Sequence, residues 1–153
     1  MKAVLQRVSH ANVTVDNEII GKIGQGILVL LGIGIDDINE DIKYLAEKVV
    51  NLRIFPDEYG KINLSVKDIQ GELLVVSQFT LMANCTKGRR PSFENAAKPE
   101  MANEMYTFFI EECRKHGIRV ESGRFQAEMH VELCNHGPVT IILDTRERKL
   151  GNI

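Results

Sequence analysis

The chain has 153 residues, of which 44% are hydrophobic and 26% charged, and its net charge is −2. This length suits one compact domain that buries enough apolar surface to fold without a metal ion or a disulfide. The slight negative charge gives no sign of the broad basic face with which proteins wrap long nucleic acids, so any nucleic-acid contact must involve only a few phosphates.

The sequence predicts a cytoplasmic protein that does not enter a membrane. Its most apolar segment, residues 27–35, is far shorter than the roughly 20 residues that a spanning helix needs. The N-terminus passes directly into a strand-like pattern, so we expect no signal peptide. The three cysteines, Cys85, Cys113 and Cys134, are odd in number and widely spaced. Such spacing argues against a disulfide framework and for a reducing compartment.

Most of the chain has the pattern of β-strands, with alternating or continuous apolar runs bounded by turn residues. A change of phase near Ser9 and His10 suggests a bulge in the first strand, and Asp16-Asn17 predicts a hairpin turn after it. The Asn135–Pro138 segment must turn before the last strand. The expected strands cover residues 4–15, 18–23, 27–34, 52–55, 61–66, 73–79, 118–120, 125–134 and 139–143.

Two segments have the apolar spacing of amphipathic helices. The first covers about residues 38–51, and Asp36-Asp37 can cap its N-terminus. The second begins at Pro99, where proline is well tolerated, and runs to about His116 with Gly117 as its C-terminal cap. Many strands with two separate helices predict a single α+β domain over the whole chain, built around a strongly curved sheet.

Polar residues that can carry chemistry gather in three segments. Ser77-Gln78-Phe79-Thr80 ends a buried strand, where loops often expose backbone N–H groups, although a solvated strand end has the same composition. Gly137-Pro138 forms either a tight turn or a cis peptide bond at a site. Three cations can bind two or three phosphates or merely increase solubility. These cations are Lys87, Arg89 and Arg90.

The sequence predicts neither a metal ion nor an organic cofactor. It lacks a glycine-rich phosphate loop, a Gly-x-Ser-x-Gly elbow, a Cys-x-x-Cys pair and a His-x-x-x-His pair. His130, Glu132 and Cys134 alternate along one strand, with His136 just beyond, and these residue types can bind zinc. A polar sheet surface explains them more simply, because structural zinc sites usually bring two paired ligand clusters.

Taken together, six segments resemble the D-aminoacyl-tRNA deacylase family. They occur in the family's order over nearly the full length, and the set is far more specific than any one of them. Two positions depart from the family's pattern, in which an acidic residue commonly stands at His136 and a glycine at Gln126. The segments are LQRVSHANVTV, LVLLGIG, LRIFPDEYGKINLSV, VVSQFTL, KGRRPSFENAAKP and NHGPVTIILD.

The resemblance implies a homodimer with a barrel-like core, a site at the subunit interface and no cofactor. Gly137 and Pro138, joined by a cis bond, would reach into the site from the partner subunit. Arg7 would help to hold that loop, and Met129 would line the pocket. The residues implied for the pocket floor, as the catalytic segment, are Ser77, Gln78, Phe79 and Thr80.

The implied reaction is hydrolysis of the ester that joins a D-amino acid to the terminal ribose of tRNA. Either the Thr80 hydroxyl attacks, or a water attacks while backbone N–H groups near Phe79 and Thr80 stabilise the oxyanion. The neighbouring residues offer no base to activate a threonine, which favours the water. The backbone of Gly137 and Pro138 would exclude L side chains and still admit glycine.

In this interpretation the cations at positions 87, 89 and 90 are the candidate contacts to tRNA phosphates. Two other interpretations remain open. One is a nucleic-acid-binding module without catalysis, against which the net acidity and the lack of an aromatic stacking platform count. The other is a non-catalytic oligomerisation domain that merely buries its Gly137-Pro138 loop in a dimer.

Overall fold

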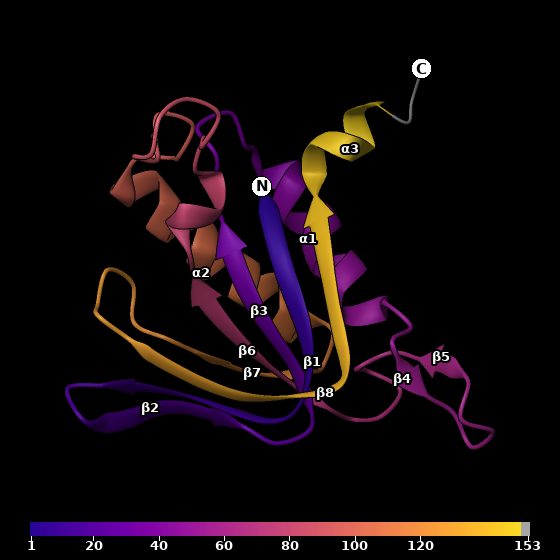
Figure 1. Ribbon diagram of the computed structural model, residues 1–153. Helices are drawn as coiled ribbons and strands as arrows, with labels where there is room; N and C mark the ends of the chain where they lie inside the picture. The colour runs from indigo at the N-terminus through magenta and orange to yellow at the C-terminus, as the bar shows by residue number, and fades with distance from the viewer. Residues whose placement is uncertain (151–153) are drawn as a thin grey trace.

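Strand β1 (Lys2–Val15) organises the fold, because it pairs along both of its edges. One edge pairs with β3 (Gly26–Gly32) and then with β2 (Glu18–Ile23), and the other edge pairs with β8 (His130–Asp144). The computed structural model describes residues 1–150, and Figure 1 shows that the sheet curves strongly toward a barrel. The α+β architecture predicted from the sequence is confirmed.

The sheet continues from β3 into two parallel strands, β6 (Glu72–Ser77) and β7 (Arg119–Ser122). Two short strands, β4 (Phe55–Pro56) and β5 (Ile62–Leu64), form a separate antiparallel pair that projects from the lower right in Figure 1. Each of these strands was expected, although most are shorter than the apolar runs that predicted them.

The predicted bulge in β1 divides the core in two. Ser9 and His10 are exposed, and the register with β8 shifts between Val8 and His10. Before the bulge, Ala3 and Leu5 belong to the larger apolar cluster under the helices. After it, the buried residues of β1 join a smaller cluster on the opposite face of the sheet, which includes side chains of β2, β3 and β6.

Helices α1 (Asn39–Asn51) and α2 (Pro99–Lys115) pack together against the larger cluster, behind the sheet in Figure 1. A short helix α3 (Thr145–Leu150) follows β8. Gly117 ends α2 with φ +79°, as predicted for a C-terminal cap. No helix within residues 1–150 is long and apolar enough to cross a membrane.

The predicted Asp36-Asp37 cap of α1 is wrong. Ile38 occupies the N-cap, and its N–H donates to Asp41 Oδ2 over 3.0 Å. Asp37 instead accepts a hydrogen bond from the Gly34 N–H and pairs with the buried amino group of Met1. A buried ammonium group needs a charged partner far more than a helix end does, and it therefore takes this carboxylate.

The predicted turn at residues 135–138 is also wrong, since β8 continues through it without reversing. Gln6 pairs with Thr140 and Val8 pairs with Asn135, so two steps along β1 match five along β8. The extra residues of β8 therefore bulge out of the ladder at the point where the sheet bends. The expected strand over residues 125–134 begins only at His130, although its alternation of half-buried and exposed residues is as predicted.

Candidate active site

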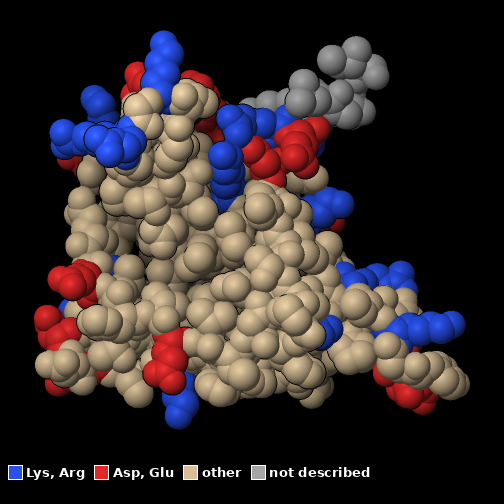
Figure 2. Space-filling view, viewed as in Figure 1, with Lys and Arg blue, Asp and Glu red and all other residues tan. Residues whose placement is uncertain are grey.

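A cavity of about 700 Å³ opens between the end of β6, the start of α2 and the loop before β8. Figure 2 shows the molecule hollowed on the left, below the protruding loop of residues 84–92. Most lining side chains are apolar. The lining residues are Ile33, Val76, Ser77, Gln78, Phe79, Phe93, Ala96, Ala97, Pro99, Ala102, Phe125, Gln126, Ala127, Met129 and Val131.

The cavity contains no side chain that titrates near neutral pH. Among the described residues that line it, there is no histidine, carboxylate, lysine, arginine, cysteine or tyrosine. Its polar side chains are the Ser77 hydroxyl and the amides of Gln78 and Gln126. Chemistry in this cavity therefore has to rely on backbone groups, neutral polar side chains or groups that a ligand brings.

The predicted floor segment passes from strand into helix at the cavity wall. Ser77 ends β6, the Gln78 N–H donates to Leu31 O over 2.8 Å, and a 3-10 helix, η1 (Phe79–Met82), begins at the next residue. The first N–H groups of a helix have no acceptor within it, and residues 1–150 provide no other backbone acceptor for those of Phe79 and Thr80, so both are available to a ligand. The strand predicted to reach residue 79 thus ends two residues earlier, at Ser77.

Ser77, Gln78 and Phe79 line the cavity, whereas Thr80 lies beside it. The Gln78 Nε2 donates to the Thr80 Oγ over 2.5 Å, which holds the hydroxyl against the amide. Gly32 allows η1 to approach β3, because a Cβ there would lie 2.9 Å from Leu81 Cβ.

The mouth of the cavity carries two aromatic rings. Phe79 is 55% exposed and meets Phe93 edge to face, with ring centroids 5.0 Å apart. Met129 also lines the cavity. Sequence reasoning did not assign Phe93 or Phe125 to the site, because they stand in irregular segments without periodicity, and it noted Gln126 only as a departure from the family's pattern.

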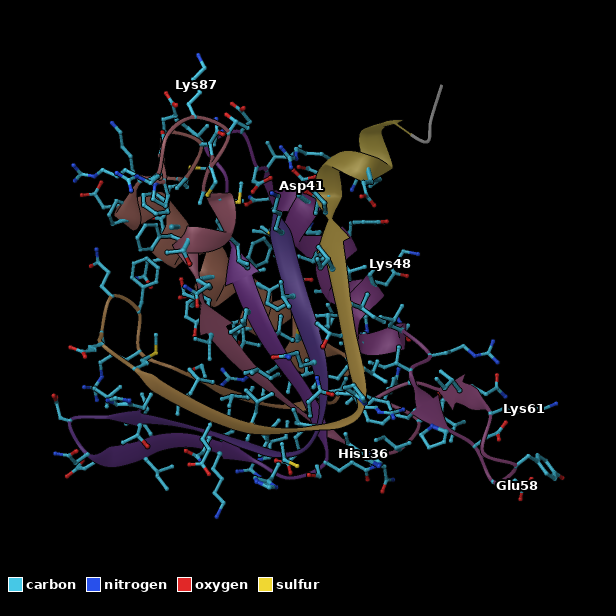
Figure 3. The ribbon with its side chains drawn as sticks, in the orientation of Figure 1. Asp41, Lys48, Glu58, Lys61, Lys87 and His136 are labelled. Carbon is cyan, nitrogen blue, oxygen red and sulfur yellow. The ribbon has the colours of Figure 1, made fainter. Side chains whose placement is uncertain are left out.

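The Gly137-Pro138 loop lies away from the cavity of its own chain. Neither residue lines it, and their neighbour His136 is found at the lower end of the sheet in Figure 3. The peptide bond between Gly137 and Pro138 is cis, as the resemblance implies. The Asn135 side chain closes the neck of the loop, because its Oδ1 accepts from the Val139 N–H over 2.9 Å.

The Arg7 side chain holds this loop by hydrogen bonding. The side chain is almost fully buried, its Nε donates to His136 O over 2.8 Å, and one terminal nitrogen donates to Ile54 O over 2.7 Å. Gly137 has φ +136°, and a Cβ at this residue would lie 2.7 Å from the guanidinium. The close approach of Arg7 therefore requires glycine at that position.

The three predicted phosphate-binding cations are exposed on one protruding loop, residues 84–92, which we call the basic loop. Backbone hydrogen bonds of 2.8 and 3.0 Å between Asn84 and Ser92 close its base. Lys87 marks the tip in Figure 3, and Figure 2 shows blue side chains gathered in this region at the upper left. Phe93 follows the loop directly and connects it to the mouth of the cavity.

His130, Glu132 and Cys134 are exposed at alternate positions of β8, as predicted. Among the described residues, no three of His, Cys, Asp or Glu lie close enough together to hold a metal ion.

Comparison with known proteins identifies the family. The family model described as D-Tyr-tRNA(Tyr) deacylase matches residues 4–144. The chain is 56% identical over 147 residues to a D-aminoacyl-tRNA deacylase of Thermosipho africanus, which covers 96% of this chain and 99% of that protein. A D-aminoacyl-tRNA deacylase of Clostridioides difficile is 57% identical over 145 residues, 95% of this chain and 97% of that protein.

Two solved structures share the fold. A c-Myc DNA unwinding element binding protein superposes with a TM-score of 0.89 at 47% identity, over 94% of this chain and 98% of that protein. A probable eukaryotic D-amino acid tRNA deacylase superposes with a TM-score of 0.83 at 18% identity, over the same shares of the two chains. The protein therefore belongs to the D-Tyr-tRNA(Tyr) deacylase family.

Proposed function

We propose that this protein hydrolyses the ester bond of D-aminoacyl-tRNA and releases the free D-amino acid and tRNA. One observation carries the proposal beyond the family: a preformed cavity, without titratable side chains, whose wall ends in the free backbone N–H groups of η1. Such a cavity suits an activated ester, which needs an oxyanion stabilised more than it needs a strong general base.

In the proposed mechanism a water molecule attacks the ester carbonyl. The N–H groups of Phe79 and Thr80 stabilise the developing oxyanion, and the adjacent ribose hydroxyl of the substrate positions or activates the water. A threonine nucleophile would need a neighbouring base, and the Thr80 hydroxyl has only the Gln78 amide, which donates to it. The absence of titratable lining residues among those described supports the same mechanism.

Replacing Thr80 by alanine tests the choice between these mechanisms. The backbone N–H remains in the variant, so we expect most of the single-turnover rate to be kept. Loss of nearly all turnover with substrate binding intact would assign the attack to the hydroxyl. The rate should also lack the bell-shaped pH dependence that an essential acid and base in the cavity would produce.

Selection of the D form is proposed to come from exclusion by the Gly137-Pro138 loop. If its backbone carbonyls hold the substrate amine, the position of Cα is fixed. An L side chain is then driven into backbone atoms, while a D side chain points to open space. Each 1.4 kcal/mol of clash corresponds to tenfold discrimination. Glycine has no side chain to clash, so glycine attached to tRNA is also accepted.

The loop lies away from the cavity of its own chain, so the proposal requires a homodimer in which each loop completes the site of the other subunit. Two features support this requirement. The sheet face over β3, β1 and β8 is free of charged side chains across the centre of Figure 2. Ile142, on β8, is 70% exposed, which is unusual for a large apolar side chain on a strand.

The basic loop is proposed to hold phosphates at the acceptor end of tRNA. A few contacts of this kind suffice for a ligand whose reacting end is buried in a cavity, which agrees with a net charge of −2. Residues 93–97 connect the loop to the cavity wall, since Phe93, Ala96 and Ala97 line it.

Deacylation of D-Tyr-, D-Phe- and D-Asp-tRNA by the purified protein tests the proposed function. We expect all three to be hydrolysed at comparable rates, because exclusion by backbone ignores the D side chain. Strong preference for one side chain would contradict the exclusion mechanism, and no hydrolysis of any would contradict the function.

A DNA-binding function has one observation in its favour, the name of the solved structure that is 47% identical to this chain. It predicts tight, salt-sensitive binding to duplex DNA and no esterase activity. Titration with a DNA duplex at two salt concentrations distinguishes it from the deacylase, for which we expect weak binding only.

A further inference from the structure

Gln126 stands at the mouth of the cavity in a backbone conformation that favours glycine. The Ala127 N–H donates to Arg124 O over 3.2 Å, which closes a four-residue turn. Gln126 is the third residue of that turn and has φ +63°. Glycine or asparagine is favoured at such a position, because a larger side chain crowds its own backbone. Glutamine therefore stands there against the local backbone preference.

The amide of Gln126 is available to a ligand. The residue lines the cavity and is exposed, while its neighbours Phe125 and Ala127 are half-buried. Among the hydrogen bonds within the described part of the chain, none involves this amide. The other amide that lines the cavity, that of Gln78, is already bound to Thr80. Of the two amides, only that of Gln126 has all its donors and acceptors available to a ligand.

The surroundings of Gln126 suit a nucleobase. The rings of Phe79 and Phe93 also lie at the cavity and are partly exposed. Exposed aromatic rings stack on nucleobases, and a glutamine amide can pair with the N6 amino group and N7 of adenine. With the ester at the end of β6, the terminal adenosine of an aminoacylated tRNA is the part of the substrate nearest the mouth.

We infer that Gln126 binds the base of that terminal adenosine and sets how tightly this protein holds its substrate. The inference rests on the proposed deacylase function and adds to it a residue that contacts the nucleoside. Since the contact is made before and during ester hydrolysis alike, it lowers KM without changing kcat. It leaves the choice among D side chains unchanged.

The test compares Gln126→Gly with the matched variant Gln70→Gly. Gln70 is also an exposed glutamine at positive φ, +54°, but it lies outside the cavity. Both substitutions relieve the same backbone conformation and are expected to preserve folding. Hydrolysis is measured with the 3′ ester of D-tyrosine on adenosine and with the 3′ ester of D-tyrosine on methyl riboside, which keeps the adjacent hydroxyl but has no base. Gln126→Asn, with a shorter amide, is included as the conservative variant.

We expect Gln126→Gly to raise KM for the adenosine ester by at least about 5-fold, the lower end for an amide that pairs with both N6 and N7 of adenine, with kcat unchanged. Gln126→Asn recovers part of the loss, and Gln70→Gly equals wild type. The methyl riboside ester is hydrolysed alike by all variants. An unchanged KM for the adenosine ester, or an equal loss on the methyl riboside ester, would overturn the inference. If the wild-type protein hydrolyses neither D-Tyr-tRNA nor the esters, the proposed function fails instead.

Discussion

Replacing Arg7 by leucine tests whether the geometry of the Gly137-Pro138 loop depends on one buried guanidinium. Arg7 donates to the carbonyl oxygens of His136 and Ile54 over 2.8 and 2.7 Å. Each hydrogen bond from a charged group contributes roughly 1.5–3 kcal/mol, and both carbonyls lose their charged donor. We expect the free energy of unfolding to fall by about 3 kcal/mol.

Urea unfolding measures this loss. With a slope of about 1.5 kcal/mol per molar urea, the midpoint should fall by about 2 M. Arg53→Leu is the matched control, because Arg53 is exposed and donates to Asn63 O over 2.8 Å; we expect it to cost less than about 0.5 kcal/mol.

The Arg7→Leu variant also separates a structural role of Arg7 from a role in selectivity. Below the unfolding transition, the loosened loop should slow hydrolysis of D-Tyr-tRNA and let L-Tyr-tRNA react measurably. Arg7→Lys keeps the charge but lacks the fork that reaches both carbonyls, and its effects should be intermediate. A destabilised Arg7→Leu protein with unchanged rate and unchanged D/L ratio would refute the claim that this contact positions the loop.

Three other predictions concern the basic loop, the subunit interface and the cysteines. Replacing the three basic-loop cations by glutamine should reduce the slope of log affinity for tRNA against log salt by about 2–3, and an unchanged slope would contradict the phosphate contacts. Ala96→Trp, which fills the cavity, and Pro138→Ala, which alters the loop, should each be inactive alone, yet mixing and re-equilibrating the two proteins should restore activity, because one heterodimer site is intact; no recovery would contradict a shared site. Burial raises the pKa of Cys113 to about 12, so in native protein at pH 8 a thiol reagent should modify only the two exposed cysteines, and modification of all three would contradict this burial.

Most of the strands could be predicted from the sequence, because their residues either alternate between apolar and polar or are apolar throughout. β3 lies in the middle of the sheet and is apolar throughout, and the Asp16-Asn17 turn has positive φ at both residues, as its composition indicates. Pattern recognition works here because local preference and burial favour the same structure.

The errors arose where a long-range partner overrides a local signal. Asp37 has the composition of a helix cap but pairs with the amino group of Met1, 36 residues away. The Asn135–Pro138 segment has the composition of a turn, yet the pairing of β1 with both halves of β8 keeps the strand continuous. Neither partner can be found from the residues next to it in the sequence.

The candidate site was predicted only in part, because some of its residues come together only through the fold. Ser77, Gln78 and Phe79 were found because they follow a buried strand, and they do line the cavity. Phe93 was not assigned to the site, since it belongs to an irregular segment that only the fold brings to the cavity mouth, and Gln126 was noted only as a departure from the family's glycine. Glutamine itself does not indicate the positive φ of residue 126, whereas the glycine that commonly stands at this position in the family does.

The most direct test of the account is hydrolysis of matched D-Tyr-tRNA and L-Tyr-tRNA by the purified protein in the presence of a chelator. We predict rapid loss of the D form alone, which would demonstrate both the deacylase activity and its selectivity. Loss of both forms would contradict the exclusion of L side chains by the Gly137-Pro138 loop, and loss of neither would contradict the deacylase function itself.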